Sequence, residues 1–340
     1  MNALEPHILK AILGAISGPD LIRLASTNTW SRDLVTGYMT ENFSIEELLK
    51  PFIDPLHTTA FRKLQQELGV VISGSQAVQF FDRRRYEGSD LDLYAHSTVS
   101  QRLEDWLTTV GYTRAKVIKR AAVKGTQKVD RVEGLYDGPV FSVATFHQRL
   151  SDHTVQVIST QNTVMEVILA FPITCVMNVI THDEAISFYP IATFDRREAL
   201  VNKMSFSHNR DAFFNKYQKR GWTITDTVDP TRRSDERSDF YCPPNSTRTR
   251  YVGDKHCWTI TLPPLAYSNK TVDYKFVNSW RLTFRNGPMT NFTILRHKKL
   301  THSYVVALDM ELLAKIDELL RETSWVHLTF PEILIIDVVS

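Results

Sequence analysis

Hydrophobic positions repeat every three to four residues over the first fifty residues, a period typical of amphipathic helices. In PHILKAILGAI, the residues Ile8, Ile12 and Ile16 lie four apart and form one apolar stripe. After a Gly-Pro break the same period continues through LIRLASTNTWSRDLVTGYM and SIEELLKPF. The pattern therefore predicts a helical N-terminal segment over residues 1–50.

From residue 51 to about 225, the spacing of the hydrophobic positions alternates between the period of a helix and that of a strand. The predicted helices are TTAFRKLQQELG, SQAVQFFD, TVSQRLEDWLTTVGY, TVMEVILAF, EALVNKMSF and HNRDAFFNKYQKRG. The predicted strands are VVIS, SDLDLYAH, AKVIKRAAV, VDRVEGLY, VFSVATFHQ and HTVQVIST, with TCVMNVIT a further candidate. This alternation predicts a mixed sheet flanked by helices.

Residues 225–250 have mixed charge, Pro and Ser and no apolar period, which predicts a mobile loop or a boundary. Strands over CWTITL, WRLTFR and SYVVAL and a helix over MELLAKIDELLRE follow. We therefore expect an α+β protein with three parts: residues 1–50, 51–225 and a strand-rich part over 226–340.

Composition narrows the class of protein. The chain has 340 residues, of which 43% are hydrophobic and 23% charged, as in ordinary globular proteins. Its net charge of +2 does not indicate nucleic-acid binding, and three cysteines suit a reducing compartment. No apolar run reaches the ~18–20 residues of a membrane span, and the N-terminus has no secretion signal. We expect an intracellular protein, cytoplasmic or nuclear, that is neither secreted nor membrane-bound.

Two short motifs in order carry the candidate chemistry. Gly74 and Ser75 open a helix after a buried strand, where backbone N–H groups favour phosphate. Asp90 and Asp92 then alternate with leucines on one strand and so share one face. Carboxylates placed together suit Mg²⁺, and two such ions can clamp the attacking and leaving oxygens of a phosphoryl-type transfer.

The stretch GSQAVQFFDRRRYEGSDLDLY resembles the DNA polymerase beta-like nucleotidyltransferase superfamily, over roughly residues 58–160. Over residues 5–225 the chain is also similar to a group of uncharacterised fungal proteins. These combine an F-box-like helical start with a similar core and a segment like YPIATF. The resemblance implies a nucleotidyltransferase-like sheet, a two-ion Mg²⁺ site at Asp90 and Asp92, and a nucleoside triphosphate held by Gly74 and Ser75.

Active members of this superfamily supply a third carboxylate from a later strand. The matching position here, in HTVQVIST, is Gln156, which cannot take a proton. Asp130, on a nearby predicted strand, and Asp152, in a predicted turn, are the alternatives. Whether the site is catalytically active depends on this third position.

Two groups of basic residues have more than one interpretation. Arg83, Arg84 and Arg85 lie between the motif halves, where they either bind triphosphate or form a solvated loop. The second group lies where the superfamily often contacts phosphate, although an ordinary charged helix face is the simpler interpretation. It consists of Lys203, Lys216, Lys219 and Arg220.

The leading hypothesis is a Mg²⁺-dependent nucleotidyltransferase that acts on an unknown acceptor. The first alternative is an inactive nucleotidyltransferase-like binding protein, with residues 1–45 as an F-box-type contact to a ubiquitin-ligase adaptor. The second alternative is this fold used for chemistry unrelated to nucleotides. The sequence names neither the nucleotide nor the acceptor.

Overall fold

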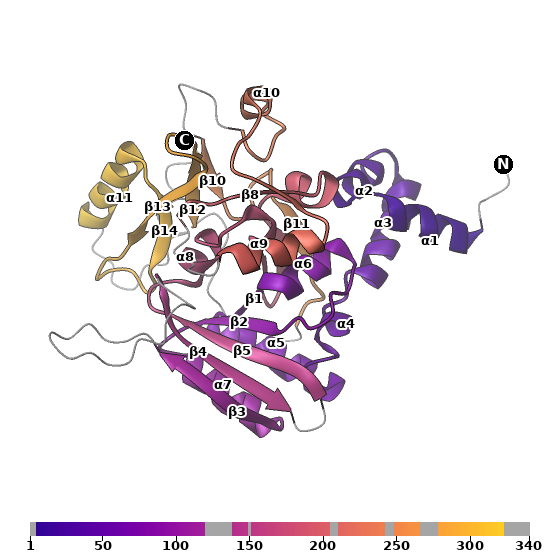
Figure 1. Ribbon diagram of the computed structural model, residues 1–340, viewed down its shortest axis with the longest axis horizontal. Coiled ribbons are helices and arrows are strands. Elements are labelled where there is room, and N and C mark those ends of the chain that lie inside the picture. Colours follow the sequence, from indigo (N-terminus) through magenta and orange to yellow (C-terminus); the bar gives the residue numbers. More distant parts are fainter. Residues whose placement is uncertain are drawn as a thin grey trace.

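The computed structural model describes residues 5–119, 138–148, 151–204, 210–241, 248–265 and 278–322 (Figure 1). Its helices are α1 Pro6–Ala15, α2 Gly18–Ala25, α3 Thr29–Asn42, α4 Ile45–Leu49, α5 Pro55–Leu68, α6 Gly74–Asp82, α7 Ser100–Thr109, α8 Val164–Leu169, η1 Thr174–Val176, η2 Ile191–Asp195, α9 Arg210–Lys219, α10 Pro230–Ser234 and α11 Met310–Glu322. Its strands are β1 Val71–Ser73, β2 Leu91–His96, β3 Tyr112–Lys119, β4 Val140–Gln148, β5 Ser151–Thr160, β6 Asn178–Ile180, β7 Glu184–Ser187, β8 Glu198–Leu200, β9 Thr223–Thr225, β10 Thr249–Tyr251, β11 Trp258–Thr261, β12 Ser279–Thr283, β13 Met289–Leu295 and β14 Tyr304–Ala307. Helices and a mixed sheet confirm the expected α+β class.

The main sheet has eight strands in the order β11-β7-β6-β1-β2-β5-β4-β3. β2 and β5 run parallel, and the other neighbouring pairs are antiparallel. In this register Ser73 of β1 lies opposite Asp92 of β2, and Asp92 lies opposite Gln156 of β5. The centre of the sheet therefore brings the two predicted motif halves and the predicted third position together.

Each face of the main sheet has its own core, as strand alternation requires. Leu91, Leu93 and Val155 point into a cluster shared with α5, α7 and the N-terminal helices. Tyr94, on the opposite face with Asp92, packs in a cluster with α8 and the smaller sheet β10-β12-β13-β14. The carboxylates thus lie on the face that α8 and the C-terminal sheet partly cover (Figure 1).

The N-terminal helices are packed against the main sheet. A Cβ added to Gly18 would lie 2.1 Å from the Trp258 ring, so only glycine permits this approach of α2 to β11. The Trp258 ring also meets Phe43 edge-on, with ring centroids 5.4 Å apart. Because β11 pairs with β7, a division of the chain at residue 225 cuts through one sheet.

Two local predictions were wrong. EALVNKMSF was expected to be helical, but Glu198–Leu200 forms β8, because parallel pairing with β9 and burial of Leu200 override helix propensity. The stretch 225–250 was expected to be a mobile loop or boundary, but part of it is core. Phe240 is fully buried, and the Asp239 carboxylate accepts the Ala192 N–H at 2.7 Å.

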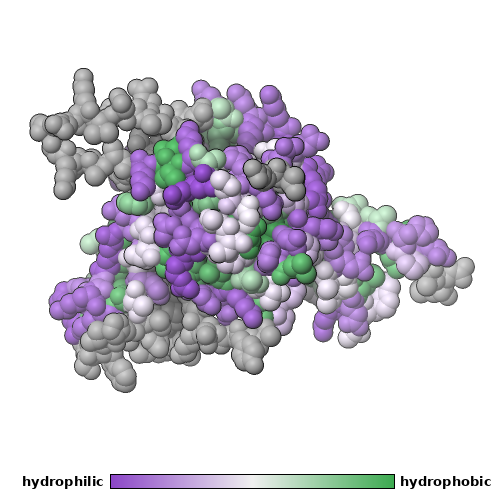
Figure 2. All heavy atoms as spheres, turned by 90° about the horizontal axis from the view of Figure 1, so that it is seen from below, coloured by the Kyte–Doolittle hydropathy of each residue, from purple (hydrophilic) through white to green (hydrophobic). Residues whose placement is uncertain are grey.

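The face of the molecule in Figure 2 carries mainly hydrophilic side chains, broken by small separate apolar spots. Among the described helices, none combines the length and the apolarity needed to cross a membrane.

Candidate functional site

The turn from β1 into α6 brings the start of a helix against a carboxylate. Gly74 has a φ of +67°, which lets α6 begin directly after β1. A Cβ at Gly74 would lie 2.5 Å from Oδ2 of Asp92, so a larger residue would displace the carboxylate. The Ser73 hydroxyl donates to the Asn178 carbonyl at 2.6 Å and does not cap α6. The first turn of α6 therefore keeps backbone N–H groups available for an anion.

Asp92 is a carboxylate in an unfavourable environment. It keeps partial exposure, yet no hydrogen-bond donor from another described residue reaches it. Burial and, to a smaller extent, the charge of Asp90 raise the pKa of Asp92 to about 7, while the charge of Lys216 opposes both effects. A bound cation or a proton would relieve this carboxylate.

Asp90 has the partners that Asp92 lacks. It directly precedes β2, and Nε2 of Gln156 donates to its Oδ2 at 3.0 Å. Burial raises the pKa of Asp90, whereas Lys216 and a hydrogen bond from Thr154 lower it. Gln156 lies where the sequence predicted the third position, but its amide acts as a donor that stabilises ionised Asp90.

Among the described residues, no alternative third carboxylate joins this pair. Asp152 lies in β5 rather than in the predicted turn, and it is exposed near the end of that strand. Asp130 lies outside the described residues. Within the described ranges, no three residues among His, Cys, Asp and Glu are grouped so as to hold a metal ion. The acidic part of the described site is therefore the pair Asp90 and Asp92.

Helix α9 contributes the positive charge. Arg220, just after α9, donates to the Ser75 hydroxyl at 3.2 Å and to the Ser89 hydroxyl at 2.8 Å. Its guanidinium lies 4.5 Å from the centre of the Tyr86 ring. No carboxylate among the described residues forms an ion pair with it. Arg220 is thus a positioned cation at the start of α6 with unused capacity for an anion.

Lys216 lies one helical turn before Arg220 and acts on both carboxylates. Much of its surface is open to solvent, yet surrounding protein and the charge of Arg220 lower the pKa of its ammonium, while Asp92 and Asp90 raise it. An ordinary charged helix face was the simpler expectation for Lys216 and Arg220. The spacing of four residues, which places both on one side of a helix, was the available signal.

The arginine run after α6 does not join this site. Arg83 donates to the carbonyls of Leu13 and Ile16, at 3.2 and 2.8 Å, and to the Tyr38 hydroxyl at 2.7 Å. Arg84 is exposed. The predicted role of Arg83 and Arg84 in nucleotide binding is therefore not supported by their placement. The nine residues of α6 put its two ends about 13 Å apart, because an α-helix rises ~1.5 Å per residue.

Comparison of the chain with models of known families, with curated proteins and with solved structures finds no match. An argument about function therefore depends on the residues of the site: a helix start, two carboxylates, two cations and an amide at the third position.

Proposed function

We propose that this site binds a nucleoside triphosphate together with Mg²⁺, and that the chain is an enzyme of the nucleotidyltransferase type. The observation that carries the proposal is Asp92, a carboxylate pressed against Gly74 with a raised pKa and no hydrogen-bond donor among the described residues. Such a carboxylate lowers the stability of the fold unless a cation compensates for its charge.

The residues around Asp92 fit the phosphates of a nucleotide. The first turn of α6 offers N–H groups, Ser75 a hydroxyl, and Arg220 a guanidinium held by Ser75 and Ser89. Arg220 can rotate from these neutral hydroxyls to a phosphate, because a guanidinium forms bidentate hydrogen bonds with an anion of opposite charge. Lys216 would offset the charge of the phosphates beside the two aspartates.

The carboxylate pair also fits Mg²⁺, since adjacent carboxylate oxygens are the protein ligands this ion prefers. Mg²⁺ held by Asp90 and Asp92 would neutralise charge on the phosphates and favour departure of pyrophosphate. Gln156 would keep Asp90 ionised and oriented for this role. No residue described at the third position can take the proton of an attacking hydroxyl, so the acceptor would have to lose it to solvent or to the substrate itself.

Equilibrium binding of ATP with Mg²⁺ tests the proposal. Arg220→Gln should weaken binding about tenfold or more, because it removes a charge-assisted contact to phosphate. Lys219→Gln is the matched control, since this exposed neighbour lies on α9 without touching the site. If both variants bind as the wild type does, the phosphate site is not here. Transfer of a labelled α-phosphate to any acceptor then distinguishes turnover from binding.

A second candidate is nucleotide binding without transfer, in a protein that contacts a partner. The amide of Gln156, in place of a base, favours it. So do large apolar side chains exposed on the N-terminal helices: Ile8, Ile12, Ile22 and Trp30. This candidate would retain the expected contact between residues 1–45 and a ubiquitin-ligase adaptor.

Deletion of residues 1–45 would not test that contact cleanly, since it uncovers Trp258 and leaves Arg83 unpartnered. Trp30→Ala is the sharper change, because this side chain is 63% exposed. Loss of binding to a purified adaptor subunit in this variant, with the fold intact, would support the second candidate. No binding by the wild type would refute it.

A further inference from the structure

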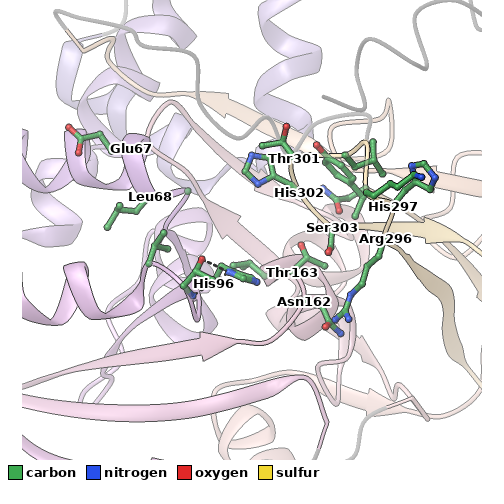
Figure 3. A pocket seen from close by; sticks show the side chains of 18 residues that line it. Glu67, Leu68, His96, Asn162, Thr163, Arg296, His297, Thr301, His302 and Ser303 are labelled. Carbon is green, nitrogen blue, oxygen red and sulfur yellow. Dashed lines mark hydrogen bonds between the residues drawn. The ribbon is translucent and has the colours of Figure 1, made fainter. Parts of the chain in front are cut away.

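A second cavity, of about 600 Å³, lies between the end of β2, the β5–α8 loop and the β13–β14 loop (Figure 3). His96 in its wall is four residues along β2 from Asp92, which is about 13 Å at the rise of a strand. The cavity is therefore separate from the site at α6, and nothing in the proposed function uses it.

One side of this cavity is basic. Arg296 and Lys298 line it, and within the described part of the chain neither forms an ion pair with a carboxylate. Arg296 interacts electrostatically with Glu166, which is not in the described lining and accepts a hydrogen bond from Asn162 at 2.7 Å. Glu67, the carboxylate in the described lining, is paired with Arg102 at 3.2 Å. The lining thus has cationic groups without matching acidic partners.

Two histidines from different parts of the chain, His96 and His302, line this cavity (Figure 3). Both ring nitrogens of His96 are engaged, by the Thr98 hydroxyl at 2.7 Å and the Gln161 carbonyl at 3.1 Å. No hydrogen bond joins His302 to another described residue. Partial burial lowers the pKa of His302, and the neighbouring His96 lowers it further. His302 is therefore a ring with free hydrogen-bonding capacity, and an anion beside it would favour its protonated form.

The cavity lining also includes apolar side chains, those of Leu68, Val99, Val164 and Leu300. The volume falls in the ~300–1,000 Å³ range of small-molecule sites and far exceeds what a phosphate ion fills. A small anion alone would leave the apolar side chains of the lining exposed to water. The volume and the lining of the cavity together suit a ligand with a charged end and an apolar body.

We propose that this cavity binds an organic phosphate monoester. Its phosphate would lie between Arg296, Lys298 and His302, and its apolar part would cover Leu68 and Val99. Arg and Lys supply the charge, and the hydroxyls of Thr301 and Ser303 in the same loop offer further donors.

Calorimetric titration at constant ionic strength, with EDTA present so that no Mg²⁺-dependent binding contributes, tests this proposal. Phenyl phosphate should bind more tightly than inorganic phosphate, and phenol should not bind. Arg296→Gln and Lys298→Gln should each weaken the binding of phenyl phosphate about tenfold, because each removes one charge-assisted contact. Lys315→Gln, an exposed change on α11, is the matched control and should bind as the wild type does.

Equal affinity in Arg296→Gln, Lys298→Gln and Lys315→Gln would overturn the proposal. Loss of binding in Arg220→Gln, but not in the two cavity variants, would place the phosphate at α6 and would also overturn it, while supporting the proposed function. AMP as a second probe identifies the source: tighter binding than phenyl phosphate indicates a nucleotide, and weaker binding a smaller ester. Either result supports a phosphate monoester site, provided that the two cavity variants weaken the binding of both probes.

Discussion

Gln156 donates its side-chain amide to the Asp90 carboxylate at 3.0 Å, from the position on β5 that lies directly opposite Asp92. The two aspartates therefore differ in kind. Burial raises the pKa of both carboxyl groups, but Asp90 accepts hydrogen bonds from an amide and a hydroxyl, whereas Asp92 has no donor among the described residues. A cation would act chiefly on Asp92, with Asp90 as the oriented second ligand.

Gln156→Glu should make the stability of the fold depend on Mg²⁺. Without Mg²⁺, we expect a loss of about 1–2 kcal/mol in the free energy of unfolding, because a hydrogen bond is lost and a like charge is added. With Mg²⁺ the loss should shrink or reverse, because three carboxylates bind a divalent ion better than two. Denaturant unfolding with and without Mg²⁺ measures both.

Gln101→Glu is the matched control for this change. Gln101 also donates to an aspartate, Asp105, at 2.8 Å, but on the solvated face of α7. Its substitution should change stability by a few tenths of a kcal/mol and show no Mg²⁺ dependence. A Mg²⁺ effect of equal size in both variants would contradict a metal site at Asp90 and Asp92.

Gly74→Ala should be much more damaging than Gly88→Ala. Both glycines have a left-handed φ, of +67° and +62°, so both substitutions should cost about 1 kcal/mol in backbone strain. Only Gly74 has a neighbour, Oδ2 of Asp92 at 2.5 Å, whereas no atom lies within 4 Å of a Cβ at Gly88. Unfolding free energies should differ by a further 1–3 kcal/mol, the typical cost of overpacking. Equal losses would show that α6 and Asp92 are not in contact.

Asp92→Asn should change how stability depends on pH. The pKa of Asp92 is raised from 3.8 to about 7 in the folded chain, so between these values the folded state binds more protons than the unfolded state. Stability from this group is therefore lost as pH rises from about 4 to 7. Asparagine does not ionise, and one pKa unit corresponds to about 1.4 kcal/mol, so the variant without metal should be more stable than the wild type by about 4 kcal/mol at pH 8 and close to it near pH 4.

Unfolding curves at pH 4.5 and pH 8, in the presence of EDTA, measure this difference. Asp152→Asn serves as the control, since Asp152 is exposed on β5 and lies outside the pair. A pH dependence that is the same in the wild type and in Asp92→Asn would rule out a raised pKa at Asp92.

Arg83→Met should weaken the packing of the N-terminal helices without changing the affinity for the nucleotide. It removes hydrogen bonds to the carbonyls of Leu13 and Ile16, leaves these carbonyls without that donor, and should lower stability by about 2 kcal/mol. Arg84→Met, one residue away and exposed, should change stability by less than about 0.5 kcal/mol. Affinity for Mg²⁺ and ATP should be unchanged in both, and a specific loss in Arg83→Met would restore the role in phosphate binding that its placement does not support.

The sequence predicted those parts of the site that local pattern determines. A buried strand before Gly74 and an alternating strand after Asp90 fix where α6 begins and which side chains share a face. The position of Gln156 was expected from the resemblance to the nucleotidyltransferases, and the parallel pairing of β2 with β5 places it opposite Asp92.

Contacts between distant segments were not predictable in this way. The sequence does not show that Arg83 turns towards α1 and α3 while Arg220, 145 residues after Ser75, reaches the start of α6. Nor does it show that β11 completes the main sheet, since pairing across a long connection leaves no local signature. Helix propensity failed at β8 for the same reason: a tertiary pairing decided the conformation.

The most direct test of the central claim is thermal unfolding of the wild type and of Asp92→Asn with ATP, CTP, GTP and UTP, each with and without Mg²⁺. A ligand at 100 times its dissociation constant stabilises by about 2.7 kcal/mol, which raises the midpoint of unfolding by several degrees. We predict such a rise in the wild type with at least one nucleotide, only when Mg²⁺ is present, and its loss in Asp92→Asn. No rise with any of the four nucleotides, or an equal rise in Asp92→Asn, would contradict a Mg²⁺–nucleotide site at Asp90 and Asp92.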